Sequence, residues 1–103
     1  MYTVIETSVF QRYADAVWSN AEREAFIHWL AAHPFEGNVI PGTGGLRKVR
    51  WGGSGAGKRG GTRVIYYNLL QEGQIWLLMV YAKSALDNLP SRFLKQLKEE
   101  LGL

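Results

Sequence analysis

The first third of the chain shows two different periods of apolar residues. Residues 2–6 alternate and are rich in β-forming side chains, which predicts a strand. Between residues 9 and 18 the apolar side chains recur at spacings of three and four, which predicts a helix with one apolar face. Thr7 or Ser8 can cap the start of this helix.

A second helix is predicted to follow at once. Ser19 has Glu22 three residues later, which is the pattern of a capping box, and apolar residues then recur at helical spacing. Pro34 ends this helix. Residues 34–45 are rich in proline and glycine and predict a connector made of turns.

The rest of the chain predicts three strands and a final helix. The strands are expected at residues 46–51, 62–70 and 74–81, with a glycine-rich loop at 52–61 and a short turn at 71–73. The last strand is apolar enough to be buried on both faces. A stripe of leucines then predicts a helix over residues 84–103, with Pro90 near its first turn.

The element order β-α-α-β-β-β-α indicates an α+β fold. We expect the last three strands to form an antiparallel meander and the helices to cover one face of the sheet. The length of 103 residues suits one domain and not two, so a single domain over residues 1–103 is expected. Hydrophobic residues make up 47% of the chain, which is typical of a globular protein and not of a disordered one.

Composition excludes several kinds of site. The chain has no cysteine, which excludes disulfides, thiolate metal sites and a cysteine nucleophile. His28 and His33 are five residues apart, the wrong spacing for one helical face, so we expect no metal and no other cofactor. No secretory signal is visible, and the longest apolar run, residues 75–82, is too short to span a membrane. We therefore expect a cytoplasmic protein with no membrane partner.

Positive charge is concentrated in the middle of the chain. The net charge is +3, but no Asp or Glu occurs from Gly37 to Gln71. Within that stretch lie six cationic residues: Arg47, Lys48, Arg50, Lys58, Arg59 and Arg63. A field of one sign at this density attracts polyanions.

Strand alternation predicts which of these cations share a face. Lys48 and Arg50 point together, while the apolar residues between and after them point the other way. Arg63 shares a face with Tyr67 in the next strand and lies near Arg50 if the two strands pair. Lys83 leaves the end of the last strand on the neighbouring side. The prediction is a cationic sheet surface with tyrosines nearby.

Such a surface suits RNA cleavage. When a 2′-hydroxyl attacks its own 3′-phosphodiester, negative charge grows on the phosphorane, and arginine offers paired donors to the phosphate oxygens. A lysine crowded by other cations has a lowered pKa and can act as base or acid. Two plainer interpretations stay open at this point: the cations bind phosphate without cutting it, or they form an ordinary solvated strand face.

The glycine-rich loop only partly matches a nucleotide-binding motif. Gly52 and the pair Gly57 and Lys58 have P-loop spacing, but Arg59 stands where a Ser or Thr would bind magnesium, and a strand follows instead of a helix. A basic loop that holds a nucleic-acid backbone and a plain hairpin loop are both compatible with it. Tyrosines at strand ends can stack on bases, although packing is the more usual role for any one of them.

At this level of detail the sequence resembles the RelE/ParE superfamily of bacterial toxins, and within it the HigB-like branch of RelE. The resemblance rests on spaced blocks in the right order: GTGGLRKVR at 42–50, GKRGGTRVIYY at 57–67, LLMVYAK at 77–83 and DNLP at 87–90. It covers the strand-rich half closely, and the first 40 residues mainly in element order.

The resemblance implies a toxin of a type II toxin–antitoxin system, an endoribonuclease that cuts mRNA in the ribosomal A site. It implies a basic strand surface as active site and no classical pair of histidines. The implied partners are the ribosome with its mRNA and a cognate antitoxin, of helix-turn-helix HigA-like type, and operator DNA is contacted only through the antitoxin complex.

Site residues carry over by position. Lys48 and Arg50 match the paired basic positions of the second strand, Arg63 matches the arginine that opens the third, and Lys83 matches a cationic position after the last. Lys58 and Arg59 belong to the HigB-like loop that holds RNA, and we add Arg47 and Tyr67 as RNA-binding residues.

Two departures from RelE leave the acid and base open. Ser84 stands where RelE has a further arginine, and residues 87–90 contain no counterpart of its late catalytic tyrosine. Tyr81 is our candidate replacement. Two alternative functions are a ParE-like toxin that inhibits gyrase and a nucleic-acid-binding module without activity.

Overall fold

A computed structural model describes residues 2–52, 61–83 and 89–103. Its elements follow the chain in this order: β1 (Thr3–Glu6), α1 (Ser8–Val17), α2 (Asn20–Ala32), β2 (Asn38–Val39), β3 (Arg47–Trp51), β4 (Thr62–Leu69), the 3-10 helix η1 (Leu70–Glu72), β5 (Gln74–Ala82) and α3 (Ser91–Glu100). The fold is α+β, as expected. No helix in the described ranges has the length and apolar character that crossing a membrane requires.

The strands form one sheet in the order β1-β5-β4-β3-β2. The antiparallel meander β3-β4-β5 confirms the prediction, and β1 adds to it by pairing parallel with β5. The short strand β2 lies inside the segment that we expected to be turns only, because Asn38 and Val39 pair antiparallel with Lys48 and Arg47. The sheet therefore ends in β1 on one side and β2 on the other.

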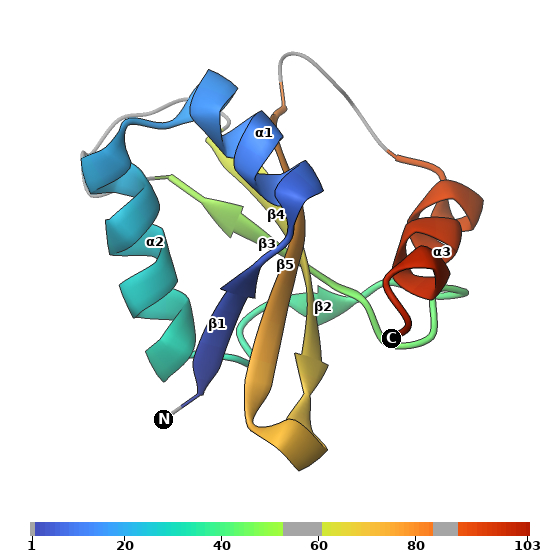
Figure 1. The fold of residues 1–103 in the computed structure, drawn as a ribbon. Coiled ribbons are helices and arrows are strands. Elements are labelled where there is room, and N and C mark those ends of the chain that lie inside the picture. Colours follow the sequence, from blue (N-terminus) through green and yellow to red (C-terminus); the bar gives the residue numbers. More distant parts are fainter. Residues whose placement is uncertain (1, 53–60, 84–88) are drawn as a thin grey trace.

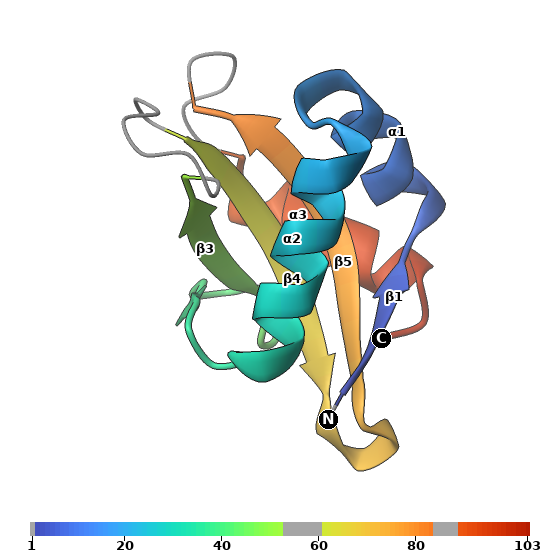
Figure 2. The ribbon, with the colours of Figure 1, turned by 90° about the vertical axis from the view of Figure 1, so that its left-hand side faces the viewer.

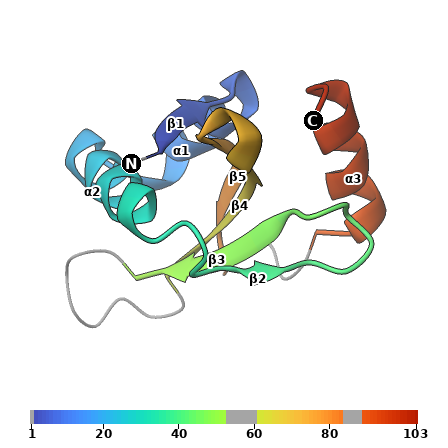
Figure 3. The same cartoon turned by 90° about the horizontal axis from the view of Figure 1, so that it is seen from below.

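The helices lie on both faces of the sheet, and the expectation that they cover one face is wrong. Figures 1 and 3 show α1 and α2 on one side and α3 on the other. The reason lies in β5, whose central side chains are buried on both faces and need cover on both. Ile75, Leu77 and Val80 join the core under α1 and α2, whereas Met79 and Tyr81 pack with Leu94 of α3.

Both N-terminal helices begin at the caps that the sequence predicts. Thr7 accepts a hydrogen bond from the Phe10 amide at 3.1 Å and donates one to the Leu77 carbonyl at 2.8 Å, so this cap also fixes α1 to β5. Ser19 accepts from the Glu22 amide at the start of α2. Figure 2 shows α2 in front of the sheet, with α1 beside its first turn.

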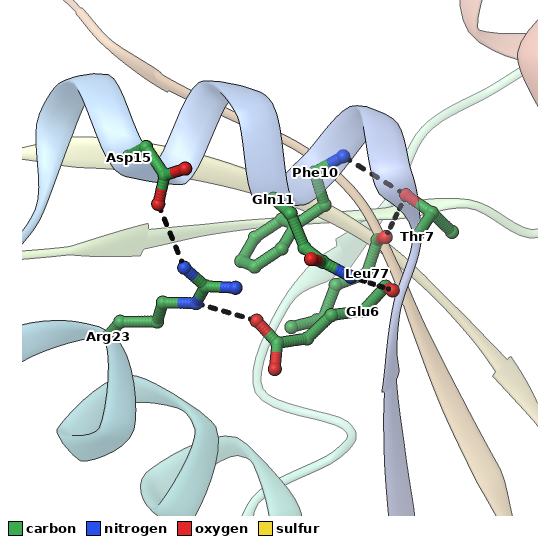
Figure 4. A network of polar contacts seen from close by, with 7 residues as sticks. All are labelled: Glu6, Thr7, Phe10, Gln11, Asp15, Arg23 and Leu77. Atoms are coloured by element: carbon green, nitrogen blue, oxygen red, sulfur yellow. Dashed lines mark hydrogen bonds and ion pairs between the residues drawn. The ribbon is translucent and has the colours of Figure 1, made fainter. Parts of the chain in front are cut away.

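An ion-pair network joins the first three elements (Figure 4). Arg23 of α2 donates to Glu6 of β1 at 2.7 Å and to Asp15 of α1 at 3.1 Å. Gln11 donates to the Glu6 carbonyl. Because the Arg23 side chain is largely buried while Asp15 is open to solvent, the contact with Glu6 is the stronger of the two.

The C-terminal elements differ in detail from expectation. The turn before β5 is the 3-10 helix η1, closed by Gly73 at φ +64. The final helix begins at Ser91, preceded by Pro90 in extended conformation, so the predicted start at residue 84 is too early; residues 84–88 lie outside the described part of the chain. The P-loop-like spacing and the cations Lys58 and Arg59 also fall outside it.

Candidate nucleic-acid interface

The pairing of β3, β4 and β5 aligns several predicted site residues. Arg50 lies directly opposite Arg63, and Arg63 lies directly opposite Tyr81. Two residues before Arg50 in β3, Lys48 lies on the same face of the sheet, opposite Ile65. We call Lys48, Arg50 and Arg63 the basic row. The structure thus brings together the three cations that strand alternation places on one face.

The basic row borders an apolar patch. On the same face, Leu46, Ile65, Met79 and Tyr81 pack with Leu94 of α3 and are all nearly or fully buried. Arg50 is exposed, while Lys48 and Arg63 are partly buried beside this patch. Charges at the margin of a low-dielectric region act on a bound anion more strongly than charges surrounded by water.

Tyr81 is next to the basic row but is buried and not exposed on the surface of the sheet. Its side chain is 3% exposed, and this burial raises the pKa of its hydroxyl, while the neighbouring Arg63 guanidinium acts in the opposite direction. The hydroxyl is therefore neutral at physiological pH. Its position opposite Arg63 allows it to support that side chain, whereas direct contact with RNA would need its cover to open.

Tyr67 is on the same face but is covered by α3. The Lys98 ammonium lies 4.9 Å from the centre of the Tyr67 ring and also donates to the Leu103 carbonyl at 2.9 Å. Gly45 passes close to the same ring: a Cβ there would lie 3.3 Å from Tyr67 Cε1, and its φ of +107 also favours glycine. The sequence alone does not reveal this contact, because nothing in it shows where α3 docks.

Arg47 points to the opposite face, which it shares with Tyr66, its partner in β4. Its guanidinium donates to the Gly37 carbonyl and lies 5.3 Å from the centre of the Phe35 ring. The structure does not bring Arg47 together with the basic row, although it precedes Lys48 in sequence. Its visible contacts fasten the segment before β2 to the sheet.

Tyr66 also holds the segment before β2 to the sheet. Its fully buried hydroxyl accepts from the Gly37 amide at 2.9 Å and donates to the Pro34 carbonyl at 2.8 Å. The Asn68 amide donates to the same Pro34 carbonyl at 2.9 Å. Burial raises the pKa of Tyr66, and the hydrogen bond from Gly37 opposes the shift.

Lys83 is exposed in the turn that follows β5. It comes directly after Ala82, which pairs with Thr62, so it lies beyond the same end of the sheet as Arg63 and Tyr81. The placement agrees with a cation at the end of the basic row. Lys58 and Arg59, which also follow that end in sequence, lie outside the described residues.

The described residues contain no cluster of three His, Cys, Asp or Glu side chains suited to a metal ion. His33 stacks on Trp29 with ring centres 5.1 Å apart, and its Nδ1 lies 2.9 Å from the Trp29 carbonyl. A cavity of about 120 Å³ opens on the side of α1 and α2, between Val17, Trp51 and Thr62. It contains none of the predicted site residues.

Comparison with known proteins bears on the fold. No family model matches the chain. A solved structure of the E. coli toxin RelE, a double arginine-to-alanine mutant in the free state, is similar with a TM-score of 0.55. The identity is 14%, and the match covers 84% of this chain and 87% of that one. The fold is therefore RelE-like, and at this identity the likeness concerns the fold alone.

Proposed function

We propose that the protein is the toxin of a type II toxin–antitoxin system, of the HigB-like branch of RelE, and that it cleaves mRNA on the ribosome. The observation that carries this proposal is the direct opposition of Arg50 and Arg63, with Lys48 beside them, on a RelE-like sheet. Like charges directly opposite in neighbouring strands are unfavourable for folding. A phosphate bound between Arg50 and Arg63 would relieve this repulsion.

The chemistry that suits this row is attack within the RNA chain. The 2′-oxygen forms a bond to phosphorus and the bond to the 5′-oxygen breaks, which leaves a 2′,3′-cyclic phosphate and a 5′-hydroxyl. In this proposal Arg50 and Arg63, which lie opposite each other, hold the phosphate oxygens as charge develops. The proton of the 2′-hydroxyl needs a base and the leaving oxygen needs an acid, and we assign these roles to the two lysines, Lys48 and Lys83.

The remaining predicted residues take secondary roles in this proposal. Tyr81 positions Arg63 from within the sheet, since it is almost fully buried. The resemblance assigns Lys58 and Arg59 to the RNA backbone, and they stay in that role. Tyr67 can stack on a base only where Lys98 leaves its ring, and Arg47 can reach RNA only from the other face.

We also propose the partners and the compartment that the resemblance implies. The toxin acts in the cytoplasm on mRNA in the ribosomal A site, and a cognate helix-turn-helix antitoxin of HigA type holds it inactive. Operator DNA is bound through the complex. A small reading frame for a helix-turn-helix protein next to this one would support the assignment.

The test is primer extension on mRNA that has been incubated with the protein, either in a translating extract or in the same extract after its ribosomes have been removed. Wild-type protein should give ribosome-dependent stops, with 2′,3′-cyclic phosphates at the new ends. Arg63→Ala should lose about 10²- to 10³-fold in rate, the usual effect of removing one donor to a developing anion, and Lys83→Ala should also lose activity. Arg12→Ala, an exposed arginine of α1, is the matched control and should cleave normally.

Three other results would count against the proposal. Full activity of both Arg63→Ala and Lys83→Ala would refute the site. Intact mRNA together with blocked gyrase would indicate a ParE-like toxin. RNA or DNA binding with neither effect would indicate a binding module without activity.

A further inference from the structure

Strand β2 forms an open edge of the sheet. Figure 3 shows it at the margin, and no described strand lies on its outer side. The Ile40 amide donates to the Leu46 carbonyl at 2.8 Å, and Asn38 pairs with Lys48. In an antiparallel ladder the inward hydrogen bonds fall on every second residue. Val39 lies between these two positions, so its N–H and C=O point away from β3.

The two faces of this edge differ in chemistry. Val39 shares a face with Arg47, its partner in β3, and the Arg47 guanidinium lies over the ring of Phe35. Phe35 and Val39 are 55% and 53% exposed, the highest values among the large apolar side chains of the described residues. Asn38 shares the opposite face with Lys48, which belongs to the basic row. One face of the edge therefore carries exposed apolar side chains together with Arg47, whose guanidinium already donates to the Gly37 carbonyl, and the other face leads to Lys48.

We propose that this edge binds an extended segment of a protein partner in which acidic and apolar residues alternate. A strand added beside β2 would bond with the outward N–H and C=O of Val39. Successive side chains of that strand would point to opposite faces. Its apolar residues would cover Phe35 and Val39, and its acidic residues would point to the side of Lys48.

Distance and charge support this choice of partner. The added strand would lie about 10 Å from β3, twice the spacing of neighbouring strands, which an acidic side chain and the long Lys48 side chain can span together. No Asp or Glu occurs from Gly37 to Gln71 to oppose it. Glu36 adjoins Phe35, which favours apolar residues on that face of the added strand. An RNA strand would use the cations but neither the apolar side chains nor the backbone edge.

Binding at this edge would also affect the basic row. Acidic side chains near Lys48 would compete with RNA phosphate for it, so the partner would inhibit cleavage; this consequence, unlike the docking itself, rests on the proposed function. Lys48 is common to both surfaces because it pairs with Asn38 on one side and Ile65 on the other.

The test uses a fluorescein-labelled peptide of alternating glutamate and valine and an isomer with the same residues in two blocks. The alternating peptide should bind the full-length protein at least tenfold more tightly by fluorescence anisotropy, and should slow amide exchange at Val39. Val39→Pro removes the outward N–H and leaves the inward bonds in place, which an edge strand tolerates, so it should weaken binding at least tenfold. Val39→Thr, which retains the N–H, should bind within threefold of wild type.

Equal binding of the two peptides, or equal binding by Val39→Pro with an unchanged thermal midpoint, would overturn the proposal. Protection of the Val39 amide by an RNA oligonucleotide and not by the peptide would overturn it in favour of RNA. Primer extension with the same proteins separates the two proposals. Peptide binding without mRNA cleavage would refute the proposed nuclease alone, and cleavage without peptide binding would refute the docking edge alone.

Discussion

Replacing Arg50 by glutamine tests whether the basic row serves to bind an anion or to stabilise the folded protein. Arg50 is exposed on β3 and lies directly opposite Arg63 on β4. Glutamine retains most of the side-chain length and its polarity but removes the charge. If the row is a binding surface, the substitution should make the folded protein more stable and bind RNA less tightly.

The expected size of the stability gain follows from the register. Two unit charges about 6 Å apart in water repel each other by about 0.7 kcal/mol, and measured cross-strand pairs lie within about 0.2–1 kcal/mol. We therefore expect the free energy of unfolding to rise by about 0.5 kcal/mol. For a chain of this length that raises the thermal midpoint by about 2–4 °C.

The assay joins two measurements on the same protein. Urea unfolding gives the change in stability, and filter binding of single-stranded RNA over a range of salt concentrations gives the loss of phosphate contacts. The loss of one contact should reduce the slope of log affinity against log salt by about 0.7. Arg12→Gln, on the exposed face of α1, is the control and should change neither quantity. Lower stability with unchanged RNA affinity would show that Arg50 is a structural residue.

Two further substitutions test how the sheet is held. Tyr66→Phe should cost about 2 kcal/mol in urea unfolding, because the buried Gly37 amide loses its acceptor. Burial raises the pKa of Tyr66 in the folded state, so the stability that its neutral hydroxyl contributes is complete below pH of about 10 and is lost as pH rises through the folded-state pKa. The phenylalanine variant should therefore lose less stability than the wild type between pH 9 and 11. The same loss of stability in both proteins over that range would contradict this. Thr7→Ala should cost about 1–2 kcal/mol, because both the Phe10 amide and the Leu77 carbonyl lose a partner, and a cost below about 0.5 kcal/mol would show that water replaces both.

Local signals predict much of this fold. The caps at Thr7 and Ser19 are where the helices begin, and the alternation of Lys48 and Arg50 with apolar residues gives the correct faces of β3. These features depend on neighbours in sequence: a hydroxyl and the amide three residues later, or a side-chain period of two. These features therefore do not depend on how distant parts of the chain pack.

Long-range pairings were not predictable in the same way. The parallel pairing of β1 with β5 joins residues some seventy positions apart, as Thr3 and Gln74 show, and no local pattern specifies it. Strand β2 is two residues long and is defined only by its pairing with β3. The position of α3 is a partial exception, because a strand apolar on both faces already implies cover on both, and the leucine stripe of α3 supplies it.

The candidate site shows the same division. Alternation is enough to place Lys48 and Arg50 together, and the register then adds Arg63 and Tyr81. Burial is not available from the pattern: Tyr81 looks like a residue that can reach substrate, but it is 3% exposed. The same limit hides Lys98 over Tyr67, because the contact depends on how a helix docks on a sheet and not on either sequence alone.

The two faces of the sheet explain why a binding surface can exist in so small a protein. The face under α1 and α2 is filled by aromatic side chains, with Trp18, Phe26 and Trp51 in contact. On the other face Leu94 of α3 packs with the apolar patch beside the basic row, and Arg50 stays exposed. Stability can thus come mainly from the first face, which leaves the second able to carry opposed arginines at a cost of only about 0.5 kcal/mol. A substitution that weakens the aromatic core should consequently unfold the protein, whereas one in the basic row should change its binding first.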